Sequence, residues 1–229
     1  MDDSASATSP DLMGHVDACL ADSGLLQNRY FHRLMSGEMS LSTFHRSQQQ
    51  FYFAVNYFSR PMAALVMRIP RGNDRLGILE NMVEEHGDFR SDRFHEATFR
   101  QFLKALGGSG ERPEAGSMQP PVHAFNATLM SACLSEEVST GIACLGIIEY
   151  AFADISSLIG TATLERGWLS SDELVHYKLH KEIDKQHAAD FFDLIQPAWQ
   201  AGHGKQQISQ GLRLGAYAFD SLYRNLIDG

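Results

Sequence analysis

Two histidines and an aspartate recur at a helical spacing in the last quarter of the chain: His180, Asp184 and His187. At about 100° per residue, offsets of four and seven place the three side chains within about 60° of one another on one helix face. Two imidazoles and a carboxylate on adjacent turns suit a transition metal. The alternative is a solvated polar face, and the neighbours that favour it are Lys181, Glu182, Lys185 and Gln186. Spacing alone leaves both interpretations open.

A further candidate metal ligand is Glu149, which lies within an apolar stretch that runs from Gly146 to Phe152. A helix over this stretch would bury the carboxylate. Burial of an isolated carboxylate costs several kcal/mol unless a cation or strong hydrogen-bond donors compensate. Glu149 therefore favours a metal site, and a buried salt bridge to a lysine or arginine is the alternative.

The third element consists of paired glutamates, Glu84 and Glu85, followed by His95. Glu84 and His95 are eleven residues apart, about three full turns, so a continuous helix would place them on one side. Glu85 would lie about 80° off that face. Because Gly87 can interrupt the helix, Glu84 is preferred over Glu85 without excluding it. We expect the remaining nearby histidines, His86 and His176, to lie at the surface or behind the ligands, where they would contact a ligand side chain without binding metal.

Together these residues form a candidate metal set that mixes carboxylates with imidazoles: Glu84, His95, Glu149, His180, Asp184 and His187. This mixture suits iron or manganese, and the absence of cysteine disfavours a structural zinc site. Six protein ligands are too many for one catalytic ion with an open position. The set therefore predicts a centre of two metal ions with bridging carboxylates.

The candidate set and its flanking segments resemble the heme-oxygenase-like diiron oxidases, in particular their CADD-like branch, which shares its fold with the TenA thiaminases and PqqC. The resemblance runs from about Leu25 to the end of the chain. Its anchors are the segments 34–38 (LMSGE), 81–87 (NMVEEHG) and 102–107 (FLKALG), the pair Glu149-Tyr150, and the His180/Asp184/His187 triplet. All six candidate ligands occupy positions that match iron ligands in that family.

The resemblance implies an all-helical fold and a non-heme diiron oxidase or oxygenase that activates O2 through a peroxo-diferric intermediate. It implies a small organic substrate, such as an amino acid or amine of secondary metabolism, and leaves room for an external electron donor. We expect the aromatic cluster between Phe51 and Phe58 to line the substrate pocket, together with four residues named here as its candidates: Tyr30, Phe31, Tyr57 and Tyr150. Core packing is the alternative role for such aromatic side chains.

Two departures from the CADD-like pattern stand out. The gap between Glu84 and His95 is longer by four residues, about one helical turn. In addition, Phe31, beside Tyr30, and Ile159 or one of its neighbours stand where the aminobenzoate-forming members carry a tyrosine and a lysine of their own, and no lysine lies between Glu149 and Lys178. The resemblance therefore does not extend to synthesis of aminobenzoate from the protein's own side chain.

Two other functions remain as alternatives. One is a metal-independent TenA- or PqqC-like enzyme, in which Cys133 or Cys144 would have to act as the nucleophile. The other is a non-enzymatic metal-binding or interaction protein. Iron content separates the diiron oxidase from the first alternative, and O2 consumption separates it from the second.

Helical periodicity runs through most of the chain and predicts seven or eight helices in one bundle. The expected helices cover residues 12–20, 25–35, 42–67 with a kink at Pro61, 74–86 with a continuation or restart over 92–106, 122–137, 141–164, 171–194 and 206–226. Ser170 and Glu173 match a capping box at the start of the helix that carries the triplet. The one long loop is expected over residues 107–121, and it joins helices of one domain.

Length and composition restrict the number of domains, the kinds of partner and the cellular location that we expect. The 229 residues suit a single domain, expected over 11–229 behind a flexible tail at 1–10. A net charge of −9 and scattered basic residues argue against a nucleic-acid partner. Three cysteines without a CxxC unit favour the cytoplasm. The apolar segment 140–160 is a poor membrane span because it carries Glu149 and Asp154. A homodimer is compatible with these features.

Overall fold

The computed structural model describes residues 11–227, and for residues 179, 181 and 182 it describes only the backbone. The expected flexible tail at 1–10 lies outside the described residues. Within them the chain forms ten α-helices and no strand. The helices are α1 (Leu12–Ser23), α2 (Arg29–Met35), α3 (Leu41–Val55), α4 (Ser59–Arg68), α5 (Leu76–Glu85), α6 (His95–Ala105), α7 (Pro120–Leu134), α8 (Val138–Glu165), α9 (Val175–Gln200) and α10 (Lys205–Asn225). The predicted all-α class is confirmed.

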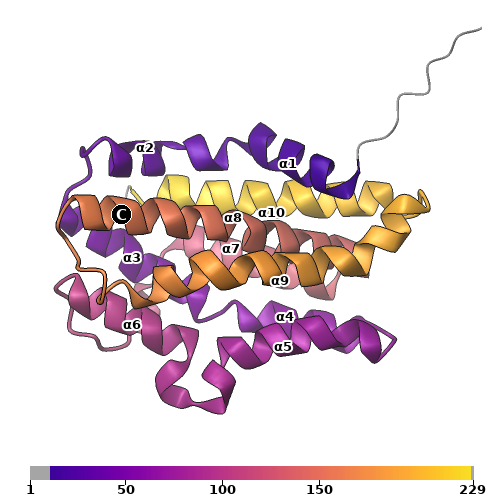
Figure 1. Ribbon diagram of the computed structural model, residues 1–229, viewed down its shortest axis with the longest axis horizontal. Helices are drawn as coiled ribbons and strands as arrows, with labels where there is room; N and C mark the ends of the chain where they lie inside the picture. The colour runs from indigo at the N-terminus through magenta and orange to yellow at the C-terminus, as the bar shows by residue number, and fades with distance from the viewer. Residues whose placement is uncertain (1–10, 228–229) are drawn as a thin grey trace, which may run out of the picture.

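Three long helices, α8, α9 and α10, run side by side through the body of the bundle (Figure 1). Helix α8 can lie very close to α10 because Gly215 has no side chain. A Cβ on Gly215 would lie 2.4 Å from the carbonyl oxygen of Cys144 in α8. Apolar side chains from all ten helices join one core around these three. The core thereby fixes the position of the residues that α8 and α9 present to each other.

Helix α8 contains the segment that resembles a membrane span in length and composition. In its most apolar window, 78% of the residues are buried inside the protein by neighbouring helices. That environment is the one a core helix has, as expected from Glu149 and Asp154. The helix therefore serves as the central element against which the others pack.

Three boundaries differ from those expected. The long segment 42–67 breaks at residues 56–58, before Pro61, and continues as α4. Pro61 thus lies in the first turn of α4, where its missing N–H costs no hydrogen bond. Helix α9 begins at Val175. The backbone N–H and the hydroxyl of Ser170 both donate to Oε2 of Glu173, but this turn lies before α9 and does not cap it. Pro197 does not end α9, which continues to Gln200.

Helices α5 and α6 are separated by a link of residues 86–94 and not continuous. Gly87, Asp88 and Phe89 all have positive φ, at 56°, 53° and 64°. Three consecutive left-handed residues cannot belong to an α-helix, so the chain turns sharply here. A Cβ on Gly87 would lie only 2.4 Å from the backbone of Arg93, so the turn needs glycine at this position. Of the two possibilities left open at Gly87, a continuous helix or an interrupted one, the structure has the interruption.

Candidate metal centre

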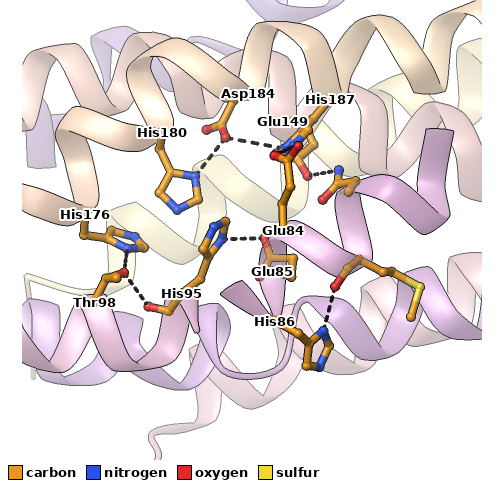
Figure 2. Close-up of polar contacts among 12 residues, drawn as sticks. Glu84, Glu85, His86, His95, Thr98, Glu149, His176, His180, Asp184 and His187 are labelled. Atoms are coloured by element: carbon orange, nitrogen blue, oxygen red, sulfur yellow. Dashed lines mark hydrogen bonds and ion pairs between the residues drawn. The ribbon is translucent and has the colours of Figure 1, made fainter. Parts of the chain in front are cut away.

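Eight carboxylate and imidazole side chains converge between α5, α6, α8 and α9 (Figure 2). They comprise the six candidates from the sequence and two more: Glu84, Glu85, His95, Glu149, His176, His180, Asp184 and His187. For description we divide them into a carboxylate-rich end (Glu84, Glu149, Asp184, His187) and a histidine-rich end (Glu85, His95, His176, His180). Asp184 joins the two ends, because its Oδ1 lies 2.8 Å from Nδ1 of His180 and 3.8 Å from Nδ1 of His187.

The triplet on α9 occupies one face, and that face is buried. His180, Asp184 and His187 are 5%, 0% and 3% exposed, whereas Lys185 between them is exposed. Their burial excludes the alternative of a solvated polar face. Helix α9 has to pack this face against α8 and α5, and the polar groups on it then need partners inside the protein.

At the carboxylate-rich end, Glu149, Asp184 and His187 each offer a ligand atom, and these atoms lie within 4.8 Å of one another. Glu84 reaches this end from α5, and Nε2 of His187 donates to its Oε2 at 2.8 Å. The Glu84 side chain is 47% exposed, so this end opens toward solvent. Nδ1 of His187 is buried without a hydrogen-bond partner, which leaves its lone pair facing Glu149 and Asp184.

The partners of Glu149 decide between the two interpretations of its burial. Asn81 Nδ2 donates to Glu149 Oε1 at 3.1 Å, and Nδ1 of His187 lies 4.0 Å from Oε2. Among the described residues, no lysine or arginine forms an ion pair with this carboxylate. The structure therefore offers no salt bridge in place of a cation.

At the histidine-rich end, the second of the paired glutamates is the buried one. Nδ1 of His95 donates to Oε1 of Glu85 at 2.9 Å, and both side chains are less than a tenth exposed. His95 begins α6, so the link 86–94 returns it to the end of α5. The paired glutamates thus both reach the centre, Glu84 at the carboxylate-rich end and Glu85 at the histidine-rich end. The preference for Glu84 over Glu85 depended on a continuous helix, which the structure does not have, so both glutamates remain candidate ligands.

His176 is fully buried at the histidine-rich end, which excludes the expected surface position but not the position behind the ligands. Its ring centroid is 4.3 Å from that of His180 and 6.2 Å from that of His95. The signal was present in the sequence, since His176 precedes His180 by four residues and so extends the same helix face. His86, in contrast, is half-buried and bonds through Nδ1 to the carbonyl oxygen of Met82.

Burial without a cation perturbs the ionisation of this centre strongly. Burial, with the neighbouring charge of Asp184, raises the pKa of Glu149 to about 8. Burial also raises the pKa of Asp184 well above its ordinary value and lowers that of His180 well below it. Burial opposes ionisation of Glu85 too, but the adjacent His95 outweighs this effect and holds the Glu85 pKa below its ordinary value. Carboxyl groups and imidazoles whose pKa values are shifted by burial and by one another in this way are typical of a functional site.

The donor set fits two divalent metal ions. Several of its polar atoms are buried with no hydrogen-bond partner: Nε2 of His176 and His180, Oδ2 of Asp184 and Nδ1 of His187. Such atoms are rare in folded proteins unless a ligand or ion satisfies them. Four carboxylates can also balance the charge of two dications. Oxygen and imidazole donors without a thiolate match iron or manganese.

A cavity of about 40 Å³ adjoins the histidine-rich end. Glu85, His95, Glu149, His176 and His180 form its polar part. Its remaining walls are apolar side chains: Phe51, Ala54, Val55, Phe58, Phe125, Ile148, Phe152 and Phe219. The volume admits a molecule the size of O2 or about three water molecules. Phe51 and Phe58 belong to the expected aromatic cluster, whereas Phe125, Phe152 and Phe219 were not anticipated.

The four aromatic residues named as pocket candidates lie elsewhere. Tyr30 and Phe31 are buried in the core, where the Tyr30 hydroxyl bonds to Ser47 and Gln48. Tyr57 is half-buried under the Arg60 guanidinium, and the Tyr150 hydroxyl donates to Asp17 at 2.8 Å. None of the four lines the cavity, because composition identifies aromatic residues but not the helix face on which each one packs.

Known proteins are similar to this chain in sequence or in fold. The sequence model of a family described as "Iron-containing redox enzyme" matches residues 46–220. A 4-aminobenzoate synthase of Chlamydia muridarum is 22% identical over 189 residues, which cover 82% of this chain and 79% of that protein. Its Chlamydia trachomatis counterpart is also 22% identical, over 81% of this chain and 80% of that protein.

Solved structures with the same arrangement share little sequence. A domain of unknown function with a heme oxygenase-like fold from Shewanella denitrificans superposes with a TM-score of 0.76 at 14% identity, covering 96% of this chain and 91% of that one. A CADD-like protein of unknown function from Nostoc punctiforme gives a TM-score of 0.74 at 14% identity, covering 94% and 95%. The heme-oxygenase-like fold and the resemblance to CADD-like proteins are thereby confirmed.

Proposed function

Because the chain belongs to the family of iron-containing redox enzymes, we propose that it is a non-heme diiron oxidase or oxygenase that uses O2 to oxidise a small organic substrate. The observation that carries the proposal is the buried donor set on α5, α6, α8 and α9, with unpartnered atoms at both ends. Bound Fe(II) ions would supply the electrons that reduce O2, through the peroxo-diferric intermediate that the resemblance implies.

The residues of the centre have separate tasks in this proposal. Glu149 and Asp184 would supply carboxylate oxygens to the metal ions, and Asp184 contacts both ends of the centre. Asn81 holds one oxygen of Glu149 through its amide and so leaves the other oxygen for metal. The apolar walls of the cavity exclude water beside the histidine-rich end, where O2 would enter.

The substrate that we propose is an external one, such as an amino acid or amine. The chlamydial relatives are named as 4-aminobenzoate synthases. In this chain Phe31 and Ile159 or one of its neighbours stand where the aminobenzoate-forming pattern has a tyrosine and a lysine, and Phe31 and Ile159 are both buried. Turnover on an external substrate also calls for an electron donor. A cytoplasmic location, a homodimer and the absence of nucleic-acid and membrane partners belong to the same proposal.

The chemistry of the two buried cysteines disfavours the metal-independent alternative. Burial raises the pKa of the Cys133 thiol to about 12 and raises that of Cys144 as well. The thiolate is the nucleophilic form, so neither cysteine is prepared for attack. Neither lies along the cavity beside the centre.

The test is anaerobic loading with Fe(II), followed by exposure to O2, with iron content, Mössbauer spectra, absorbance and O2 consumption measured. We expect close to two irons per chain and rapid O2 consumption. Zn(II)-loaded protein is the control, since it fills the site without redox chemistry. A limit of one iron per chain would contradict the dinuclear centre. Two irons without O2 consumption would favour a metal-binding or interaction protein.

A further inference from the structure

His176 is a fully buried histidine at the metal centre that lies outside the ligand set expected from the resemblance. It projects from α9 one turn before His180, and it lines the cavity. Its Nε2 atom is buried and has no hydrogen-bond partner. A buried ring nitrogen in this position requires a functional or structural explanation, because leaving it unsatisfied costs free energy.

The hydrogen bonds of Thr98 determine which nitrogen of His176 carries the proton. The Thr98 hydroxyl donates its single hydrogen to the carbonyl oxygen of His95 at 3.0 Å. The same oxygen lies 3.1 Å from Nδ1 of His176, so Nδ1 must be the donor in that contact. Nε2 of a neutral ring then carries a lone pair. The unpartnered atom is therefore an acceptor, the form that binds a metal ion.

The three histidines of this end are held in the same way. Nδ1 is the bonded atom in each: to Glu85 in His95, to Thr98 in His176, and to Asp184 in His180. A metal-binding histidine typically uses one ring nitrogen for such a fixed partner and the other for the metal. In Figure 2 the three rings lie close together, with His95 at the start of α6 and the other two on α9.

The spacing of the rings fits a shared ion. The centroid distances are 4.3 Å between His176 and His180, 4.5 Å between His95 and His180, and 6.2 Å between His95 and His176. Three imidazoles bound through nitrogen to one ion at about 2.1 Å have centroids about 5 Å apart. The observed distances bracket that value, so small side-chain movements would bring all three rings onto one ion.

We propose that Nε2 of His176 is a metal ligand, so that the ion at the histidine-rich end is held by three imidazoles, from His95, His176 and His180. The inference rests on the proposed function, because it places a metal ion at this end. An imidazole adds a ligand without adding negative charge. The ion beside Glu85 therefore keeps more net positive charge than the ion at the carboxylate-rich end, and the two ions are chemically unequal.

The direct test observes the side-chain nitrogens of isotope-labelled histidine by NMR during titration with Zn(II), which is diamagnetic. The His176 resonances are assigned by their loss in His176→Gln. We expect the metal-free protein to show an unprotonated Nε2 on His176, and we expect Zn(II) to move that resonance together with the one of His180. A His176 Nε2 resonance that stays in place while His180 responds would overturn the inference.

Binding measurements supply a second, independent readout. His176→Phe keeps an aromatic ring in the site and removes the donor atom, and we expect at least a tenfold loss of affinity for one of two Fe(II) ions under anaerobic conditions. Thr98→Val removes the partner of Nδ1, and we expect a smaller loss of the same kind. His86→Phe is the matched control, because His86 lies outside the cavity.

These outcomes also separate the inference from the proposed function. Parent protein that binds two irons and consumes O2, with unchanged affinities in His176→Phe and His176→Gln, would overturn the inference and leave the function standing. Parent protein that binds neither Fe(II) nor Zn(II) would overturn both. Circular dichroism spectra of each variant show whether a loss of binding reflects loss of the fold.

Discussion

The buried carboxyl group of Glu149 makes the stability of the metal-free protein depend on pH in a defined way. The folded protein raises its pKa to about 8 from an ordinary value of 4.5, because burial and the neighbouring Asp184 oppose its ionisation. The folded state then binds a proton on Glu149 that the unfolded chain has already released. Glu149→Gln keeps the shape and the hydrogen bond from Asn81 but stays neutral at every pH, so it should remove this dependence.

The sign and size of this pH dependence follow from the linkage between proton binding and folding. A group whose pKa is raised on folding binds more protons in the folded state, so its contribution to stability falls as pH rises from 4.5 to about 8. At about pH 5.5 the cost of ionisable Glu149 is ~1.5 kcal/mol, and at about pH 8.5 it is ~4.5 kcal/mol. We therefore expect metal-free Glu149→Gln to exceed the parent in free energy of unfolding by ~3 kcal/mol more at the higher pH than at the lower one.

The assay is urea unfolding of chelator-treated protein at the two pH values, followed by circular dichroism, with Glu80→Gln as the control on an exposed position. Other titrating groups shift both proteins alike, so the difference between parent and variant isolates Glu149. A difference that does not change with pH would refute the reasoning, because it would mean that Glu149 ionises freely in the fold. Zn(II) should reverse the order, since a bound cation stabilises the parent carboxylate and not the amide.

Further expectations concern the ligands and the link that positions them. In a calorimetric titration, His187→Ala should lower the affinity for one of two metal ions at least tenfold, about 1.4 kcal/mol in binding free energy. Lys185→Ala, on the exposed side of α9, should leave both affinities unchanged. If both variants behave alike, the triplet is not a metal-binding unit. Glu85→Gln should lower metal affinity more than Glu84→Gln, because Glu85 is buried against His95 and Glu84 is 47% exposed; the opposite order would identify Glu84 as the stronger ligand. Gly87→Ala should cost more than about 1 kcal/mol in urea unfolding, because a positive φ of 56° and a backbone contact at 2.4 Å both exclude a Cβ. An unchanged unfolding midpoint would contradict the left-handed link.

Local periodicity predicted the elements and residues that depend on a single helix. The all-helical fold and the buried face of His180, Asp184 and His187 follow from offsets within one segment, and the structure has both. The burial of Glu149 follows from its apolar neighbours in the same way. In each case one helix contains the whole pattern, so 3.6 residues per turn are enough to place the side chains.

Sequence alone was insufficient wherever the chain turned between two elements. The facing of Glu84 or Glu85 toward His95 depends on the backbone at Gly87, whose left-handed conformation no helical period describes. The expected surface position of His176 did not use its spacing of four residues from His180, which places it on the same buried face. Tyr30 and Phe31 were misplaced because a buried aromatic ring can pack on the core or line a cavity, and only tertiary packing decides which.

The left-handed link between α5 and α6 also bears on how this centre can change through insertions and deletions. Within α9 the count of residues between ligands cannot vary, because one added residue would rotate His187 by about 100° away from Asp184. Between Glu85 and His95 the chain leaves one helix and starts another, so residues can be gained or lost in the link while both ligands keep their places. A search for relatives should therefore hold the α9 spacing fixed and leave the interval after the paired glutamates variable. A fixed interval would discard chains that build the same centre with a shorter or longer turn.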